Sequence, residues 1–361
     1  MINCAIGPVQ MDAETCSLAS EQIPYFRTAE FSRMMTENES LLCALFDAPD
    51  GSRAVFTTGS GTAAMEGAVM NFFSADDRVL VVNGGGFGRR FCQLCAIHGV
   101  PFTEIALGHG LPLRAEHLAP FEGAGYTGFL VQLCETTTGV RYDMDMVGDF
   151  CARNGIFLCV DAVSGFLADE FSMKSMRVNA AMTASQKALS LPPGMAFTVL
   201  DGTAVGRCAR GFARSLYFDY RECLSDGVRG QTPFTPAVGT LVLLNEKLRR
   251  VMREGGAQAL VRSVAARAAR FRRGLAGLPL VPFCAAEHSS NCLTALSPTS
   301  PGVSARRVCD ILKDEHGIWV CPNGGELSET VFRVGHVGAL SDGDTDALVA
   351  ALSDMAKRGQ L

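Results

Sequence analysis

The chain has 361 residues, of which 48% are hydrophobic, and its formal net charge is -5. This length and composition support a large domain with a sizeable core plus a smaller one, and they exclude an intrinsically disordered chain. Acidic and basic residues are interleaved along the sequence, so the charge pattern does not indicate a surface that binds nucleic acid.

The N-terminus and the cysteines indicate a cytoplasmic protein. Residues 1–10 contain no basic segment followed by a sustained apolar run, and no apolar run reaches the ~18 residues of a membrane-spanning helix. Among fourteen cysteines, only Cys92 and Cys95 have CxxC spacing, and no second pair completes a zinc site. We therefore expect a soluble chain without a bound metal, whose cysteines are reduced core residues.

Short apolar runs alternate with helical stretches from about residue 53 onward. This alternation predicts an α/β fold with a largely parallel sheet that helices cover on both faces. Helices are expected over 61–73, 87–98 and 144–153. The predicted strands are 53–57, 78–82, 102–106, 128–133, 156–160, 178–182 and 195–200.

The C-terminal third has a different pattern. Long arginine-rich helices are predicted over 237–253 and 257–277, and the acidic total favours a solvated helix face over a nucleic-acid surface for them. A strand near 291–295 and helices over 304–315 and 342–355 follow. We expect a large domain over residues 15–250 and a small α+β domain over residues 251–361 together with residues 1–14.

Lys187 lies between two of the short apolar runs, just ahead of the Pro-Pro-Gly break at residues 192–194. An unpaired buried ammonium is costly, so this lysine either reaches the surface, is paired, or is used chemically. The strand ends of a parallel sheet gather at one edge, and this edge is where α/β proteins bind ligands. Lys187 is therefore expected near such an edge.

Two glycine-rich turns lead from predicted strands to helices and would reach the same edge. The turn at 57–66 has free backbone N–H groups that suit a phosphate, although such turns also serve as ordinary connections. The turn at 83–90 resembles a dinucleotide fingerprint but lacks the ribose-binding acid. Phe87 in this turn either offers its ring for stacking or packs in the core.

Two further polar stretches follow predicted strands. Residues 134–139 are a run of hydroxyls, and Asp161 ends an apolar strand. Each alone is as readily a polar loop, but a buried carboxylate needs a cationic partner, such as the protonated nitrogen of a heterocycle. A phosphate loop, an aromatic ring, hydroxyls, an aspartate and a lysine together are the parts that hold pyridoxal 5'-phosphate. Lys187 would then act as a general acid and base, which requires a lowered pKa.

The motifs at 60–66, 135–139, 160–162, 185–189 and 332–335 resemble those of the class V aminotransferases, in order and over nearly the whole chain. The resemblance implies fold type I, with a mostly parallel seven-stranded sheet in the large domain. It also implies pyridoxal 5'-phosphate as cofactor, a small-molecule amino donor, a 2-oxo acid acceptor, and a homodimer with shared active sites.

The same resemblance assigns roles to individual residues. Lys187 would bind the cofactor covalently and Asp161 would pair with its pyridine nitrogen. Phe87 would stack on the ring, and Thr136 would lie beside its phenolic oxygen. Arg333 would take the carboxylate of pyruvate or alanine in a bidentate fork. The residues expected at the phosphate are Ser60, Gly61, Thr62, Gln186 and, from the second subunit, Thr235.

Within the class, stretches such as 135–140 and 332–338 resemble the 2-aminoethylphosphonate:pyruvate aminotransferases. This implies a ping-pong transfer that yields phosphonoacetaldehyde and L-alanine. The segment 24–32 instead resembles the alanine and serine:glyoxylate enzymes, which leaves the amino donor open. Arg27, with Arg89 and Arg90, is a candidate for binding a second anion, and a solvent-facing role is equally open for each.

Two other classes of function also remain open. Some relatives of this class are lyases or desulfurases, and the latter need a catalytic cysteine on a mobile loop; Cys309 and Cys321 occur in the C-terminal part, but neither stands in such a motif. A cofactor-free binding protein of the same fold could lose Lys187 or Asp161, and this chain has both.

Overall fold

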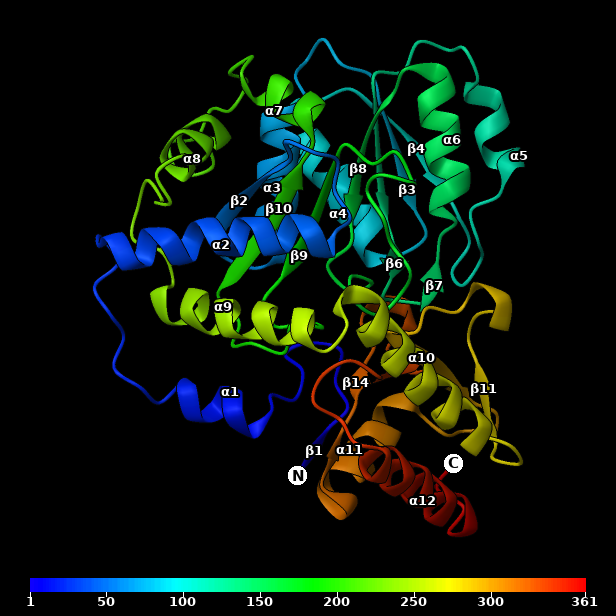
Figure 1. The fold of residues 1–361 in the computed structure, drawn as a ribbon. Helices are drawn as coiled ribbons and strands as arrows, with labels where there is room; N and C mark the ends of the chain where they lie inside the picture. The colour runs from blue at the N-terminus through cyan, green and yellow to red at the C-terminus, as the bar shows by residue number, and fades with distance from the viewer.

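The structure, a computed structural model, describes residues 1–361 and is built around a seven-stranded sheet (Figure 1). Each neighbouring pair of strands is parallel except the pairs that contain β10, which is antiparallel to β9 and to β2. This confirms the predicted α/β fold with a mostly parallel sheet, and each strand begins and ends within two residues of its predicted bounds. The spatial order is β2 (Arg53–Thr58), β10 (Met195–Leu200), β9 (Ala180–Ala184), β8 (Phe157–Asp161), β5 (Gly128–Gln132), β3 (Val79–Asn83) and β4 (Phe102–Ala106).

Helices cover both faces of this sheet because successive strand residues point to opposite sides. In β3, for example, Val79 and Val81 pack into one hydrophobic cluster, and Leu80 and Val82 pack into another. The first cluster includes residues of α3 (Gly61–Phe72), α4 (Gly86–Ile97), α7 (Gly202–Cys208) and α8 (Tyr220–Gly227). The second includes residues of α2 (Ala29–Leu45), α6 (Met144–Asn154) and α9 (Val238–Arg253).

The C-terminal third forms an antiparallel four-stranded sheet with its own hydrophobic cluster. The helices α10 (Gly256–Gly274) and α12 (Asp342–Lys357) lie side by side against it (Figure 1). The N-terminal strand β1 (Ile2–Asn3) pairs with β13 (Ile318–Trp319), so the first residues lie against this part of the chain. The strands of the small sheet are β11 (Leu280–Pro282), β12 (Leu293–Pro298), β15 (Phe332–Gly335) and β14 (Cys321–Pro322).

The remaining elements are short, apart from one helix in the C-terminal part. These elements are α1 (Ala13–Leu18), α5 (Ala115–Leu118), α11 (Ala305–His316), β6 (Cys134–Glu135), β7 (Val140–Arg141) and the 3-10 turns η1 (Ala119–Phe121), η2 (Ala286–His288) and η3 (Gly325–Leu327).

None of the helices in the structure has both the length and the apolar composition needed to cross a membrane.

Two helical glycines differ in the space around them, which gives a stability test of the packing. A methyl group at Gly148 in α6 would overlap the main-chain oxygen of Met176, whereas one at Gly206 in α7 would meet no atom within 4 Å. We expect Gly148→Ala to lower the free energy of unfolding by about 1–2 kcal/mol, because overpacking outweighs the better helix propensity. Gly206→Ala should raise it by about 0.5–1 kcal/mol. Urea denaturation of both variants checks this pair, and a stabilising Gly148→Ala would contradict the packing.

Candidate active site

The carboxyl ends of the parallel strands meet at one edge of the central sheet. The helix α3 starts there after β2, and α4 starts there after β3. Residues 134–139 follow β5, Asp161 ends β8, and the turn with Lys187 follows β9. The antiparallel β10 begins at the same edge, since the Gly59 N–H donates to the Gly194 oxygen over 2.8 Å. The structure thus brings the predicted lysine, aspartate, hydroxyl run and glycine-rich turns together.

Lys187 lies against the N-terminal segment. Its Nζ donates to the Ile6 carbonyl oxygen over 2.7 Å, and a Cβ atom at Gly7 would stand only 2.8 Å from Nζ. The Val9 N–H also donates to the Gln186 oxygen, over 3.2 Å. Burial lowers the pKa of Lys187, because the protonated amine loses hydration. A lysine in this setting is suited to covalent and proton-transfer chemistry.

Asp161 is buried, with 5% of its surface exposed, and it forms no salt bridge. Its Oδ1 accepts from the Val163 N–H over 2.9 Å. Desolvation and, to a smaller extent, the charge of Glu135 raise the pKa of Asp161 to about 6, against the opposing effects of the Val163 N–H and the Lys187 charge. A buried carboxylate without an ionic partner is a site for a cationic group of a ligand.

The N-terminal turn of α3 carries three of the residues predicted at the phosphate. Ser60 is its N-cap and makes no side-chain capping bond. Gly61 lies so close to Val163 that a Cβ atom would stand 2.9 Å from the valine Cγ2, which places this turn beside the loop after Asp161. Thr62 Oγ1 accepts from Arg90 Nη1 over 3.0 Å, and the Arg90 guanidinium lies 4.8 Å from the centre of the Phe87 ring. Arg90 therefore links the predicted phosphate site to the predicted stacking ring.

Arg333 approaches this edge from β15. Its Nη1 donates to the Thr136 oxygen over 3.2 Å and its Nη2 to the Pro322 oxygen over 2.7 Å. Burial lowers the pKa of Arg333. A cavity of about 500 Å³ lies here between the large sheet's edge and the C-terminal third. It is lined by Phe87, Arg89, Arg90, His109, Thr137, residues 323–327 and Arg333, among others.

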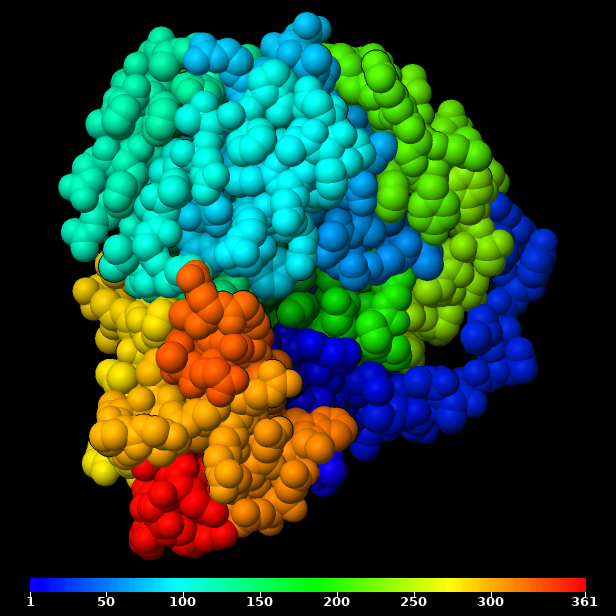
Figure 2. Space-filling model, turned by 180° about the vertical axis from the view of Figure 1, so that it is seen from behind, coloured from blue at the N-terminus to red at the C-terminus, as the bar shows by residue number.

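The junction that holds this cavity is seen from behind in Figure 2. The orange residues from the C-terminal third rise toward the cyan part of the chain, and the dark blue N-terminal segment lies beside them. One polar contact spans the cavity lining, between His109 Nε2 and Glu326 Oε1 at 2.7 Å.

Several buried polar atoms at this edge have no hydrogen-bond partner. They are the side-chain amide atoms of Gln132, the Thr136 hydroxyl oxygen and the Arg333 Nε. Buried polar groups in folded proteins are nearly always paired, so this group of exceptions fits a polar ligand. The uncapped start of α3 suits a phosphate dianion, and Asp161 suits a protonated ring nitrogen. The residues present therefore fit pyridoxal 5'-phosphate.

Arg27 and Thr235 are not part of this cluster within one chain. The Arg27 guanidinium donates to Gln231 Oε1, the Thr232 oxygen and the Pro233 oxygen, over 3.0, 2.8 and 3.2 Å. Its donors are thus engaged by the loop before α9, where Thr235 is exposed. The predicted roles of both residues, in binding a second anion and in reaching a second subunit, stay predictions.

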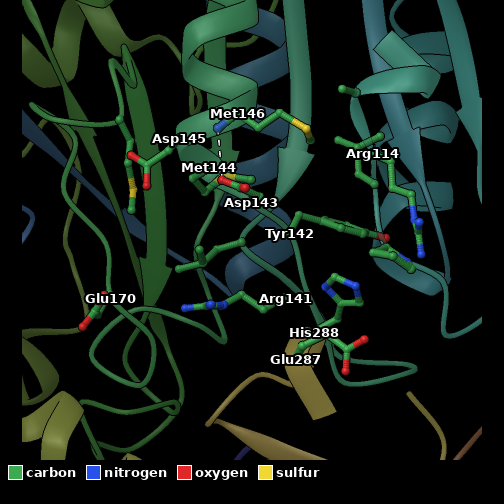
Figure 3. Close-up of a pocket in the computed structure, with 15 residues that line it drawn as sticks. Arg114, Arg141, Tyr142, Asp143, Met144, Asp145, Met146, Glu170, Glu287 and His288 are labelled. Atoms are coloured by element: carbon green, nitrogen blue, oxygen red, sulfur yellow. Dashed lines mark hydrogen bonds between the residues drawn. The ribbon is translucent and has the colours of Figure 1, made fainter. Parts of the chain in front are cut away.

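A second, larger cavity lies elsewhere, next to α6 and η2 (Figure 3). It measures about 740 Å³ and contains none of the predicted site residues. Its charged side chains are of both signs and do not converge on one point: Arg114, Glu170 and Glu287 lie on different sides of it (Figure 3). The structure also brings no three histidine, cysteine or acidic side chains together as a metal site.

Some residues at the site escaped the sequence patterns. The Ile6 oxygen and Gly7 contact Lys187, and the only local signal for them is the turn-forming Gly7-Pro8 pair. Asn323 Nδ2 donates to the Thr137 oxygen over 2.8 Å, and Glu135 accepts from the first turn of α4. No periodicity marks these contacts, because they join segments that are far apart in the sequence.

Comparison with known proteins gives one consistent family. The family model described as Aminotransferase class-V matches residues 22–336. The chain is 30% identical over 297 residues to an L-aspartate--glyoxylate aminotransferase of Paracoccus denitrificans, covering 78% of this chain and 73% of that protein. It is 28% identical over 331 residues to a 2-aminoethylphosphonate--pyruvate transaminase of Pseudomonas entomophila, covering 90% and 89%.

Two further similarities cover nearly the full length. A protein of Anabaena cylindrica named soluble hydrogenase 42 kDa subunit is 29% identical over 352 residues, which cover 96% of this chain and 90% of that one. The crystal structure of an aspartate aminotransferase from Thermus thermophilus superposes with a TM-score of 0.90 at 25% identity, and the match covers 99% of both chains. This agreement confirms the fold type I architecture.

The buried Asp161 predicts a trade-off between stability and function. Its pKa of about 6 in the folded chain exceeds the ordinary value of 3.8, so ionisation of the carboxyl opposes folding above that range. Cofactor-free Asp161→Asn should therefore be more stable than the cofactor-free native protein, on the order of 3 kcal/mol near pH 8. The gap should shrink to about half near pH 5, because the native carboxyl takes up its proton as pH falls.

Urea denaturation at both pH values measures this gap. The matched control is Asp76→Asn, which neutralises an exposed carboxylate and should leave stability unchanged. An Asp161→Asn variant less stable than the native protein near pH 8 would show that the carboxylate is paired in the folded chain.

Proposed function

This chain belongs to the class V aminotransferases, and from that premise we propose that it transfers the amino group of 2-aminoethylphosphonate to pyruvate. The products are phosphonoacetaldehyde and L-alanine, formed in two half-reactions on pyridoxal 5'-phosphate, the cofactor of this family. One observation carries the aminotransferase chemistry. The ionically unpaired Asp161 ends β8, and Lys187 lies in the turn that follows the neighbouring β9, at one sheet edge beside a cavity that Arg333 lines.

Different residues at this edge would hold different groups of the cofactor. The start of α3, with Ser60, Gly61 and Thr62, would hold the phosphate, and Phe87 would lie on the ring. Asp161 would hold the ring nitrogen, with Thr136, Gln186 and Lys187 completing the enclosure. When bound, pyridoxal 5'-phosphate supplies an electron sink for negative charge that develops on the substrate carbon.

Lys187 performs the proton transfer in this proposal. Because burial lowers its pKa, Nζ releases its proton more readily than the amine of an exposed lysine does. The Ile6 carbonyl oxygen and Gly7 confine the amine on its N-terminal side. Asp161 would keep a proton on the cofactor's ring nitrogen, since a carboxylate stabilises a neighbouring cation.

Arg333 binds the substrate's anionic group. Its guanidinium can form a planar fork to a carboxylate, and its Nε has no partner within the chain. Arg89 and Arg90 line the same cavity, opposed by a single acidic side chain, Glu326. This excess of positive charge favours substrates that carry a carboxylate or a phosphonate.

The relatives support two donors. The Pseudomonas entomophila protein supports 2-aminoethylphosphonate with pyruvate, as do the motifs at 135–140 and 332–338. The Paracoccus denitrificans protein supports the second candidate, transfer from an amino acid to glyoxylate. We also propose a cytoplasmic homodimer in which Thr235, which is exposed within one chain, contacts the phosphate site of the second subunit.

The visible spectrum of the purified protein tests the donor. Addition of 2-aminoethylphosphonate should remove the absorbance band of the bound cofactor, and pyruvate should restore it. Loss of the band with L-aspartate, L-alanine or L-serine alone, restored by glyoxylate, would replace the phosphonate proposal by the second candidate. A protein that takes up no pyridoxal 5'-phosphate would remove the aminotransferase proposal altogether.

Replacement of the lysine tests the assignment of the proton-transfer group. Lys187→Ala should lower kcat by roughly a thousandfold or more, because it removes both the covalent attachment and the general base. Lys174→Ala, at an exposed lysine, is the control and should retain native turnover. Turnover assays with the best donor measure both, and an active Lys187→Ala protein would rule the assignment out.

A further inference from the structure

The glycine-rich turn at the start of α4 is occupied by a side chain of the protein itself. The Glu135 carboxylate accepts from the Phe87 and Gly88 N–H groups, each over 3.1 Å, and from the Thr137 N–H over 3.1 Å. The Gly86 N–H donates to Thr137 Oγ1 over 3.0 Å. An internal carboxylate thus takes the position that a phosphate would occupy in a nucleotide-binding turn of this composition.

Glu135 is fully buried and has no cationic partner within salt-bridge distance. Its charge is balanced by three backbone N–H groups and by the positive end of the α4 dipole. Burying a carboxylate in this way is costly unless its hydrogen bonds are complete, so its position is closely specified.

Close contacts explain three of the glycines in this turn, and one of these contacts is with Glu135. A Cβ atom at Gly85 would stand 2.7 Å from the Glu135 Cδ. A Cβ atom at Gly84 would overlap the Tyr142 hydroxyl, and one at Gly88 would overlap the Val82 oxygen. The carboxylate therefore requires a glycine at position 85, whereas Gly84 and Gly88 leave room for Tyr142 and for the main chain of β3.

Two predicted site residues depend on the contacts of this segment. Phe87 is held through its backbone N–H on one side of Glu135. On the other side, the Thr136 oxygen accepts from Arg333. The segment 135–137 therefore connects the stacking ring to the guanidinium that binds substrate.

We propose that Glu135 is a positioning residue that acts on the cofactor through Phe87. Its carboxylate fixes the first turn of α4 and thereby sets the plane of the Phe87 ring over the cofactor site. This inference rests on the proposed function, since it requires pyridoxal 5'-phosphate at this edge.

The test compares Glu135→Gln with the native protein. Glutamine keeps the shape but sets an NH₂ group against a backbone N–H donor, so the turn loses a charged acceptor. We expect the dissociation constant for pyridoxal 5'-phosphate to rise roughly tenfold or more. The circular dichroism of the bound cofactor's visible band should weaken, because that signal reports how the ring is held.

A double-mutant cycle separates positioning from a purely electrostatic effect on Asp161. In a Phe87→Leu background, Glu135→Gln should change the dissociation constant less than about threefold, because the group through which it acts is gone. A full tenfold effect that persists in this background would overturn the proposal. The control is Glu104→Gln, which removes the charge of the side chain that accepts from Asn83 Nδ2 over 2.7 Å on the outer side of the same turn, and it should behave as the native protein.

Gly85→Ala provides a second route if Glu135→Gln does not fold, which thermal unfolding of the cofactor-free protein will show. Its backbone is extended, with φ of 170°, so the methyl group adds no backbone strain and presses only on the carboxyl of Glu135. The same weakening of affinity and dichroism supports the proposal. Native values in a folded variant overturn it, while a native protein without cofactor uptake overturns the proposed function and this inference together.

Discussion

Buried charge at the carboxyl edge of the central sheet is the constraint on which this site depends. Asp161 and Glu135 both lie in the interior, and neither has a cationic side chain within salt-bridge distance. The protein completes the hydrogen bonds of only one of them. Glu135 is satisfied by backbone N–H groups, whereas Asp161 retains an unmatched charge that burial makes costly. A ligand with a protonated nitrogen resolves this imbalance.

The two helix starts beside these carboxylates are used differently. The start of α4 is filled by Glu135 and serves to hold Phe87, while Ser60 leaves the start of α3 without a side-chain cap. The dipole of α4 thus stabilises an internal carboxylate, whereas the dipole of α3 remains available to the anion of a ligand. Arg333, which the C-terminal third contributes, adds a cation whose hydrogen bonds to the Thr136 and Pro322 oxygens orient it toward the cavity.

Much of this arrangement could be predicted from local patterns. Apolar runs of five or six residues bounded by turns predict the strands of a parallel sheet and the edge where they end. Asp161 and Lys187 could be placed at this edge because they lie at or just after such runs. The seven strands and the covering helices α3, α4 and α6 followed from the same alternation, whereas α2, α7 and α8 were not predicted. The motif order indicated the family, and the comparisons bear this out.

The remaining contacts could not be predicted, because they are tertiary. The carboxylate of Glu135 reaches Phe87 across 48 residues of sequence, and Arg27 reaches Thr232 across 205. The glycines at 84–88 illustrate the limit: composition alone is equally typical of a phosphate-binding turn. Only the folded chain shows the carboxylate inside it.

The position of the N-terminal segment also determines when the site can form during synthesis. Strand β1 pairs with β13, and the Ile6 oxygen that accepts from Lys187 belongs to the same segment. The central sheet is complete once residue 200 has left the ribosome, but the partner of β1 is made more than a hundred residues later. Because domains usually fold in the order of their synthesis, the central sheet can form first in a nascent chain. The N-terminal segment beside Lys187 can take its place only after the last third of the chain has been made. The surroundings of Lys187 therefore join the first residues to be made with residues made in the last third of synthesis.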